Sequence, residues 1–149
     1  MYGEDIKMVD ISKKPVTARE AVVQASISLK PQTLKLIADK KIPKGDVLTI
    51  AKCAGILAAK KVDELIPLCH SLPLEHVEIA FKLERKSILI TAKCKTKART
   101  GVEMEAMLAS CISALTIYDM CKSVDRSAVI SQIRLMEKRG GRSGHYERK

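Results

Sequence analysis

One stretch, residues 100–122, constrains the fold of this chain more than any other part of the sequence. The chain carries 27 lysines and arginines, yet this stretch has no basic residue before Lys122. Its other charges are Glu103 and Glu105 at the start and Asp119 near the end. The segment between them, AMLASCISALTIY, is small and apolar on nearly every side. That pattern is typical of a helix that is buried all round.

The charges at the two ends of this predicted helix allow two interpretations. Two glutamates in the first turn suit the positive end of the helix dipole, whereas Asp119 and Lys122 share a face near the other end. The simpler interpretation is that these are helix-end residues in contact with solvent. The alternative is a functional site, because charges stand at both ends of one stripe: Glu105, Leu108, Ile112, Leu115, Asp119 and Lys122.

Length and charge narrow the class of protein. A chain of 149 residues is most simply one domain, here 1–149, with a sizeable core. The net charge of +10 favours an anionic partner, such as a phosphorylated small molecule or nucleic acid. Three tyrosines, one phenylalanine and no tryptophan are too few for a base-stacking surface, so we expect no nucleic acid.

The cysteines and apolar runs indicate a cytoplasmic location. The five cysteines include no CxxC pair, and most lie in apolar runs, as reduced thiols of cytosolic proteins do. The acidic, polar N-terminus does not resemble a signal peptide. The longest uncharged run, residues 106–118, is too short to span a bilayer. We therefore expect no membrane segment.

Hydrophobic periodicity predicts a regular order of elements between a mobile N-terminal arm, residues 1–19, and a flexible C-terminal tail, residues 140–149. Alternation predicts strands at 20–30, 77–83, 88–98 and 129–136, the middle two forming a hairpin. Helical spacing predicts a short helix from Pro31 and a longer one over 47–65, capped by Asp46. The glycine-rich stretch 140–144 either cradles phosphate or is a frayed end.

This order predicts an α+β fold. Without the short helix it is β-α-β-β-α-β, a ferredoxin-like antiparallel sheet with one extra helix and with the helices on one face. One sheet face gives too little cover for a helix that is apolar all round. Oligomerisation is the simplest source of the remaining cover.

A stiff loop and two groups of cations are further candidates. Pro67 and Pro73 bracket an apolar loop in which His70 is structural, a general acid or base, or a ligand. Its only nearby candidate metal partners, His76 and Cys94, lack zinc-type spacing, so we predict no metal site. Lys44 precedes a helix start and can bind an anion there, although a solvated loop lysine is the simpler interpretation. The basic row 93–99 is favoured as a solvated sheet face.

Several segments together resemble the molybdenum-cofactor biosynthesis protein C (MoaC) family, the cyclic pyranopterin monophosphate synthases. The segments are MVDIS (8–12), KGDVL (44–48), LIPLCH (65–70), TGVEMEA (100–106), LTIYDMCK (115–122) and GGRSG (140–144). The resemblance runs in order from residue 8 to residue 144 without large gaps. Ser71 stands where the family usually has proline, and Arg142 where it often has lysine.

The resemblance implies a lyase of the phosphorus–oxygen type in molybdenum cofactor biosynthesis. Its substrate would be (8S)-3',8-cyclo-7,8-dihydroguanosine 5'-triphosphate, supplied by a partner radical enzyme. The product would be cyclic pyranopterin monophosphate, formed as diphosphate leaves. The assembly implied is a hexamer built as three dimers, with sites at the dimer interfaces.

Carried over residue by residue, the resemblance implies two groups of site residues. The catalytic residues would be Lys44, Asp119 and Lys122. The substrate-binding residues would be Leu68, Cys69, His70, Glu103, Met104, Glu105, Lys14 and Arg19. No cofactor is expected, although a divalent cation can accompany the triphosphate.

The geometry of a helix adds a hypothesis about where this site lies. Glu105 and Asp119 share a stripe but are about 21 Å apart along the axis, at 1.5 Å per residue. No small pocket can use both ends of one copy. Two copies packed antiparallel would bring the Glu105 end of one beside the Lys122 end of the other.

Two rival classes remain open at this stage. A nucleic-acid-binding module of ferredoxin-like fold would explain the net charge and the basic strand, but it lacks the aromatic residues of RNA-binding sheets. A scaffold oligomer without chemistry would leave the acids and Lys122 on a core helix unexplained. Turnover of the cyclised nucleotide, with release of diphosphate, distinguishes the three classes.

Overall fold

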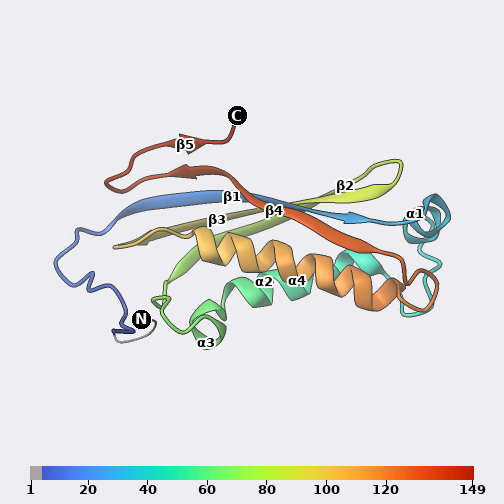
Figure 1. Ribbon diagram of the computed structural model, residues 1–149, viewed down its shortest axis with the longest axis horizontal. Coiled ribbons are helices and arrows are strands. Elements are labelled where there is room, and N and C mark those ends of the chain that lie inside the picture. The colour runs from blue at the N-terminus through green and yellow to red at the C-terminus, as the bar shows by residue number, and fades with distance from the viewer. Residues whose placement is uncertain (1–4) are drawn as a thin grey trace.

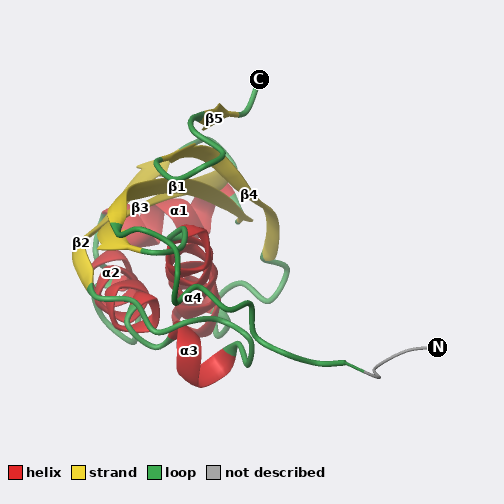
Figure 2. Cartoon of the chain, turned by 90° about the vertical axis from the view of Figure 1, so that its left-hand side faces the viewer, coloured by secondary structure: helices red, strands yellow, loops and turns green. Residues whose placement is uncertain are grey.

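The computed structural model describes residues 5–149 and shows one sheet with helices beneath it (Figure 1). The elements are β1 Thr17–Ser28, α1 Pro31–Ala38, α2 Val47–Ala59, α3 Val62–Leu65, β2 Leu74–Leu83, β3 Ser87–Ala98, α4 Glu103–Cys121, β4 Val129–Arg139 and β5 Tyr146–Glu147. The strand order is β2-β3-β1-β4-β5, and all neighbouring strands are antiparallel. The end-on view shows α2 and α4 on the same side of the sheet (Figure 2).

The predicted α+β, ferredoxin-like fold is confirmed. Leaving out the short elements α1, α3 and β5 gives β-α-β-β-α-β, and β1 and β3 lie at the centre of the sheet. The extra helix before α2 is present as α1 and begins at Pro31 as predicted. Asp46 caps α2, since its side chain accepts a hydrogen bond from the Thr49 amide at 3.3 Å.

The core lies between the central strands and the two long helices. The inward faces of β1, from Ala21 onward, and of β3 are buried, as their alternation predicts. Their largest buried side chains are Val23, Ile27, Ile88 and Ile90. The apolar face of the sheet therefore sets where α2 and α4 must lie.

Gly55 allows α2 and α4 to approach each other closely. A methyl group at Gly55 would lie 2.8 Å from the Ala109 carbonyl oxygen and still closer to the Ser113 hydroxyl. Ser113 donates that hydroxyl to the Ala51 carbonyl at 3.0 Å, which joins the two helices by a buried hydrogen bond. The segment before α2, which carries Lys44, is thereby placed relative to α4, and His70 lies in the loop between α3 and β2.

Helix α4 is covered on one side only. Its residues Ala106, Ala109 and Ala114 are fully buried, but Met104 is 39% and Leu115 is 53% exposed. The expectation of burial all round is therefore unmet in a single chain. By length and composition alone α4 could cross a membrane, yet half of that window is buried inside the fold.

Several boundaries differ from the sequence predictions, and strands β2 and β4 are each three residues longer than predicted. The helix predicted over 47–65 is broken, because the Lys60 and Lys61 amides turn back to the Leu57 and Ala58 carbonyls. Strand β1 begins at Thr17, so Arg19 belongs to the sheet and not to the arm, of which residues 1–4 lie outside the described part of the chain. The segment after 140 folds back and forms β5 beside β4.

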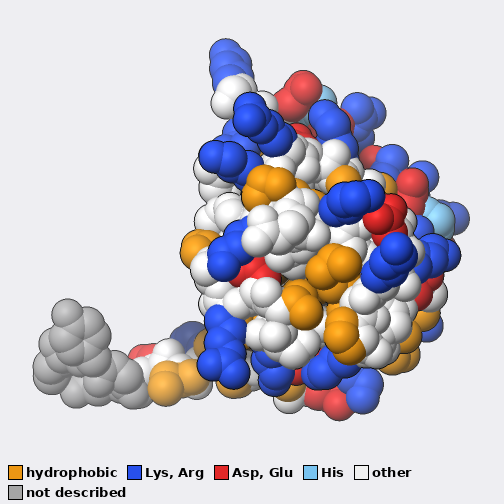
Figure 3. All heavy atoms as spheres, turned by 90° about the vertical axis from the view of Figure 1, so that its right-hand side faces the viewer, with side chains coloured by type: hydrophobic (Ala, Val, Ile, Leu, Met, Phe, Trp, Pro, Cys, Tyr) orange, Lys and Arg blue, Asp and Glu red, His pale blue; other side chains and the backbone are white. Residues whose placement is uncertain are grey.

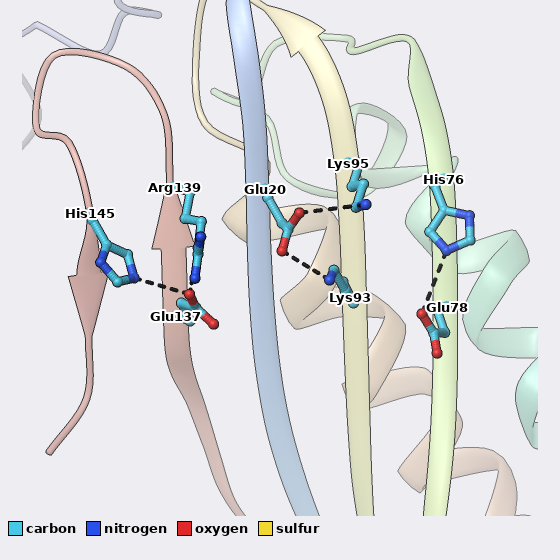
Figure 4. A network of polar contacts seen from close by, with 8 residues as sticks. All are labelled: Glu20, His76, Glu78, Lys93, Lys95, Glu137, Arg139 and His145. Atoms are coloured by element: carbon cyan, nitrogen blue, oxygen red, sulfur yellow. Dashed lines mark hydrogen bonds and ion pairs between the residues drawn. The ribbon is translucent and has the colours of Figure 1, made fainter.

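The outer face of the sheet carries a mixed network of charges (Figure 4). Glu20 pairs with Lys93 at 3.0 Å and with Lys95 at 3.7 Å, so part of the basic row is neutralised. Glu137 is paired with Arg139 and His145, from β4 and the segment before β5. This arrangement favours a solvated sheet face over a binding surface for nucleic acid.

Candidate functional site

The first turn of α4 carries two glutamates in different environments. Glu103 is half-buried and forms an ion pair with Lys138 of β4. Glu105 is only 4% exposed. Burial, reinforced by repulsion from Glu103 and Asp63, raises the pKa of the Glu105 carboxyl to about 7. Glu105 can therefore give up or take up a proton near neutral pH.

The loop before β2 places His70 and Cys69 beside this turn. The Thr96 hydroxyl donates to the Pro73 carbonyl at 2.7 Å and ties the loop to β3. His70 Nε2 lies 2.7 Å from the Val9 carbonyl oxygen of the arm. Burial and the nearby Glu105 raise the pKa of the Cys69 thiol, so that thiol stays protonated near neutral pH.

Two adjoining cavities open at this end of α4. The smaller, of about 290 Å³, is lined by Leu68, Cys69, His70, Met104 and Glu105, among others. The larger, of about 740 Å³, lies between the arm, β1 and the loop after β4. Both are bordered by Lys14, Thr100, Gly101 and Glu103, so they form one continuous recess. The structure thus brings together all eight residues predicted to bind substrate, with Arg19 in the larger cavity.

The larger cavity is strongly cationic. Six basic side chains line it, against the single carboxylate of Glu103: Lys13, Lys14, Arg19, Arg99, Lys138 and Arg142. Three of these, Lys13, Arg99 and Lys138, were not predicted as site residues, and Arg142 belongs to the glycine-rich stretch for which phosphate binding was one of two interpretations. A cluster of lysines and arginines with little counter-charge is suited to a polyphosphate.

Lys138 lies beyond the strand predicted over 129–136, and a β-bulge determines which face of the sheet it occupies. Val23 pairs with Leu135, but Val22 pairs with Glu137, so β4 gains one residue between them. The extra residue reverses the alternation of faces beyond Leu135. Lys138, opposite Ala21, consequently points to the inner side of the sheet, where it meets Glu103.

The three residues predicted to be catalytic form a separate cluster at the other end of α4. Asp119 accepts a hydrogen bond from Lys44 Nζ at 3.0 Å and pairs with Lys122 Nζ at 2.9 Å. A hydrogen bond from Lys122, and to a lesser extent one from Lys44, holds the pKa of the Asp119 carboxyl below its usual range. Figure 3 shows this end of the molecule, where many basic side chains surround a few apolar ones.

The predicted site residues therefore fall into two groups at different ends of the molecule, which are called half-sites because the hypothesis of a shared site divides one site between them. Lys44, Asp119 and Lys122 do not border either cavity at the start of α4. The separation of about 21 Å along the helix between Glu105 and Asp119 is retained, because α4 is one continuous helix. In Figure 1 the first half-site lies at the left-hand end and the second at the right.

Metal-binding residues are not clustered in the part of the chain that the structure describes. Among residues 5–149 no group of three or more His, Cys, Asp or Glu side chains could hold a metal ion. All five cysteines are free thiols. The prediction that the protein has no resident cofactor stays a prediction.

Comparison with known proteins gives one consistent result. The chain matches the MoaC family over residues 8–141. A protein of Magnetococcus marinus named cyclic pyranopterin monophosphate synthase is 54% identical over 144 residues, which cover 95% of this chain and 88% of that protein. Proteins of the same name from two strains of Chloroflexus aurantiacus are also 54% identical, with the same coverage.

Proposed function

The chain belongs to the MoaC family, and on that basis we propose that it is a cyclic pyranopterin monophosphate synthase. The reaction converts (8S)-3',8-cyclo-7,8-dihydroguanosine 5'-triphosphate into cyclic pyranopterin monophosphate and diphosphate. A hydroxyl oxygen attacks the α-phosphorus, the bond to the β-phosphate oxygen breaks, and the hydroxyl proton passes to a base. The observation that carries the proposal is the cationic cavity that continues into a smaller recess with a buried acid.

The larger cavity fits the triphosphate. Negative charge builds up on the leaving diphosphate as the cyclic phosphate closes, and fixed cations stabilise that charge. Lys14, Arg19 and Lys138 reach the cavity from the arm, β1 and β4, so three separate chain segments supply its cations. The ion pair between Lys138 and Glu103 also marks the border with the smaller recess.

The smaller recess fits the ring system, where the rearrangement needs proton transfers. A carbonyl oxygen can only accept a hydrogen bond, so the contact with Val9 assigns the proton of a neutral His70 to Nε2. The other ring nitrogen, Nδ1, then has the lone pair that can accept a hydrogen bond. Glu105, with its pKa of about 7, supplies a group that can carry a proton near neutral pH.

The second half-site supplies the predicted catalytic residues, which do not line this recess. Two copies with antiparallel α4 helices place Lys44, Asp119 and Lys122 of one beside Glu105 of the other. The open side of α4, with Met104 and Leu115, offers an apolar surface for such contact. Each active site would then take the recess from one chain and the two lysines with Asp119 from its partner.

The wider setting follows from the same proposal. Three such dimers would form the expected hexamer, and a radical enzyme would supply the cyclised substrate. No resident metal takes part, although a divalent cation can accompany the triphosphate. Five free thiols and the absence of nucleic-acid-binding aromatics agree with a cytoplasmic enzyme that acts on a small molecule.

One assay tests the activity directly. The purified protein is mixed with the cyclised nucleotide, and diphosphate and the pyranopterin product are measured over time. We expect stoichiometric formation of both products, retained after treatment with a chelator if no resident metal is needed. Binding of generic RNA with strong salt dependence and without turnover would instead favour the nucleic-acid module. An inert, well-folded oligomer would favour a scaffold.

A further inference from the structure

Two glycines at the end of β4 adopt conformations that other residues rarely take. Gly140 has φ +95° and Gly141 has φ +78°, both in the left-handed region that favours glycine. Gly144, three residues on, has φ +70° and nothing within 4 Å of the place a methyl group would occupy. Gly140 and Gly141 differ from Gly144 in that protein atoms fill this space.

The atoms that fill the space beside Gly140 and Gly141 belong to Ala18 and Arg19 of β1. A methyl group at Gly141 would lie 2.9 Å from Arg19 Nη2 and closer still to Nη1 and Cζ. One at Gly140 would overlap the Ala18 carbonyl oxygen and lie 3.2 Å from Arg19 Cδ. The guanidinium of Arg19 is thus packed directly on bare backbone at Gly141.

A hydrogen bond within β1 also holds the guanidinium. Arg19 Nε donates to the Thr17 hydroxyl oxygen at 2.8 Å. Thr17, Arg19 and Gly141 all line the larger cavity. A planar guanidinium held by its Nε and by backbone packing keeps its Nη atoms in a set direction, which a free arginine would have to adopt on binding.

The segment after Gly141 holds the glycines in place. The Gly144 amide donates to the Gly141 carbonyl at 3.2 Å, which closes the turn. Strand β5 then pairs with β4 through Tyr146 and Lys138. The Arg148 amide donates to the Met136 carbonyl at 2.8 Å and extends this pairing. The C-terminal segment therefore anchors the loop against β4.

We propose that Gly141 and Thr17 are positioning residues that hold the Arg19 guanidinium at the wall of the cationic cavity, ready to bind the triphosphate. This role rests on the proposed function, because it assigns the cavity to the phosphates. It gives the glycine-rich loop a task other than binding phosphate through its own amides. Any residue larger than glycine at 141 displaces the guanidinium, and loss of the Thr17 hydroxyl leaves it free to rotate.

The test compares matched variants of the full-length protein. Gly141→Ala introduces a methyl group at positive φ against Arg19, and Gly144→Ala introduces one at positive φ into open space. Thr17→Val removes the hydroxyl, and Thr17→Ser keeps it. Binding of inorganic tripolyphosphate is measured by calorimetry, KM and kcat are measured with the cyclised nucleotide, and the Arg19 Nε–H signal is followed by NMR.

We expect Gly141→Ala and Thr17→Val to weaken tripolyphosphate binding and raise KM about tenfold, equivalent to about 1.4 kcal/mol, with little change in kcat. Both should shift the Arg19 Nε–H signal, whereas Gly144→Ala and Thr17→Ser should resemble the wild type. In an Arg19→Ala background, Gly141→Ala should have no further effect on binding.

Other results would overturn the role of these residues. If Gly141→Ala and Gly144→Ala weaken tripolyphosphate binding equally, Gly141 matters only for the backbone conformation of the loop. If Gly141→Ala weakens binding just as much in the Arg19→Ala background, Gly141 does not act through Arg19 and the positioning role is refuted. If Gly141→Ala does not fold, normal tripolyphosphate binding by Thr17→Val would refute it instead. A further outcome is that the wild type and the variants bind tripolyphosphate with the expected differences while the wild type does not turn over the nucleotide. That result would support the positioning role and refute the proposed activity.

Discussion

Glu105 and Asp119 show how one helix gives two carboxyl groups different acid–base behaviour. Burial raises the pKa of Glu105 to about 7, whereas hydrogen bonds from Lys122 and Lys44 lower the pKa of Asp119. Titratable groups whose pKa values are pushed apart are suited to complementary roles as acid and base. In the proposed dimer the two groups meet in one site, where Asp119 stays ionised and Glu105 exchanges a proton.

The pKa of Glu105 makes a prediction for stability. Its folded-state pKa is above the usual 4.5, so the folded chain binds more protons than the unfolded chain between pH 4.5 and about 7. Stability should therefore fall as the pH rises through this range, by up to about 3 kcal/mol. Glu105→Gln should remove this fall, and denaturant unfolding at pH 5 and pH 8 measures it.

A matched control exists two residues away, in the same first turn of α4. Glu103→Gln removes a half-buried carboxylate that is paired with Lys138, so it should not abolish the fall in stability with pH. The same pH dependence in the wild type and Glu105→Gln would contradict the assignment.

The cluster at the end of α4 gives a second prediction at this scale. Asp119 and Lys122 have side chains that are each 53% exposed, and exposed ion pairs contribute at most about 1 kcal/mol to stability. Asp119→Asn and Lys122→Ala should therefore lower kcat at least about a hundredfold while leaving the fold and assembly intact. Diphosphate release, thermal unfolding and light scattering measure these three properties. Aggregated or dissociated variants would make the pair structural.

At the scale of elements, the arm and the start of β1 deliver two cations to the same cavity. Lys14 precedes the strand and is exposed, whereas Arg19 lies within it. We expect the double variant Lys14→Ala, Arg19→Ala to bind substrate at least about tenfold more weakly, with a reduced dependence on salt concentration. The melting temperature should change by only a few degrees. Unchanged binding would mean that these cations do not contact the substrate.

Much of the fold could be predicted because its periodicities are simple. Alternation identified β1, the β2–β3 hairpin and β4, and the Pro31 and Asp46 signals marked the starts of α1 and α2. Strand β5 has only two residues, Tyr146 and Glu147. Both are exposed, so no apolar pattern in the sequence predicts this strand. It forms because the turn through Gly141 returns the chain to β4.

The positions of the candidate site residues could also be predicted only in part. The residues carried over from the family segments reach either the recess or the second cluster, as their order along α4 requires. Lys138 was missed because the predicted strand ended at residue 136, and because a β-bulge reverses the alternation beyond Leu135. Arg99 and Arg142 border the cavity from chain segments just outside β3 and β4, where no period applies.

At the scale of the whole molecule, the two half-sites predict complementation between damaged chains. Glu105→Gln and Lys122→Ala proteins, each inactive alone, are unfolded together and refolded as a mixture. A mixed dimer then has one doubly damaged site and one intact site. With random pairing, half of the dimers are mixed, so about a quarter of wild-type activity should return.

The controls make this result specific to the shared site. Each variant refolded alone should stay inactive, and a mixture of two variants from the same half-site, such as Lys44→Ala with Lys122→Ala, should recover nothing. If mixed dimers form without activity, the shared site is wrong. Glu105 would then act only within its own chain, most simply by stabilising the start of α4.

The differing reactivity of the cysteine thiols offers a way to detect contact between two copies of the chain. The thiolate is the form that reacts with alkylating reagents, and environment raises the pKa of four of the five thiols: Cys69, Cys94, Cys111 and Cys121. Cys53 is exposed on α2, between the exposed side chains of Ile50 and Leu57. A maleimide dye should therefore label the native protein mainly at one position. Its labelling rate would report whether that side of α2 is bare or covered by another copy.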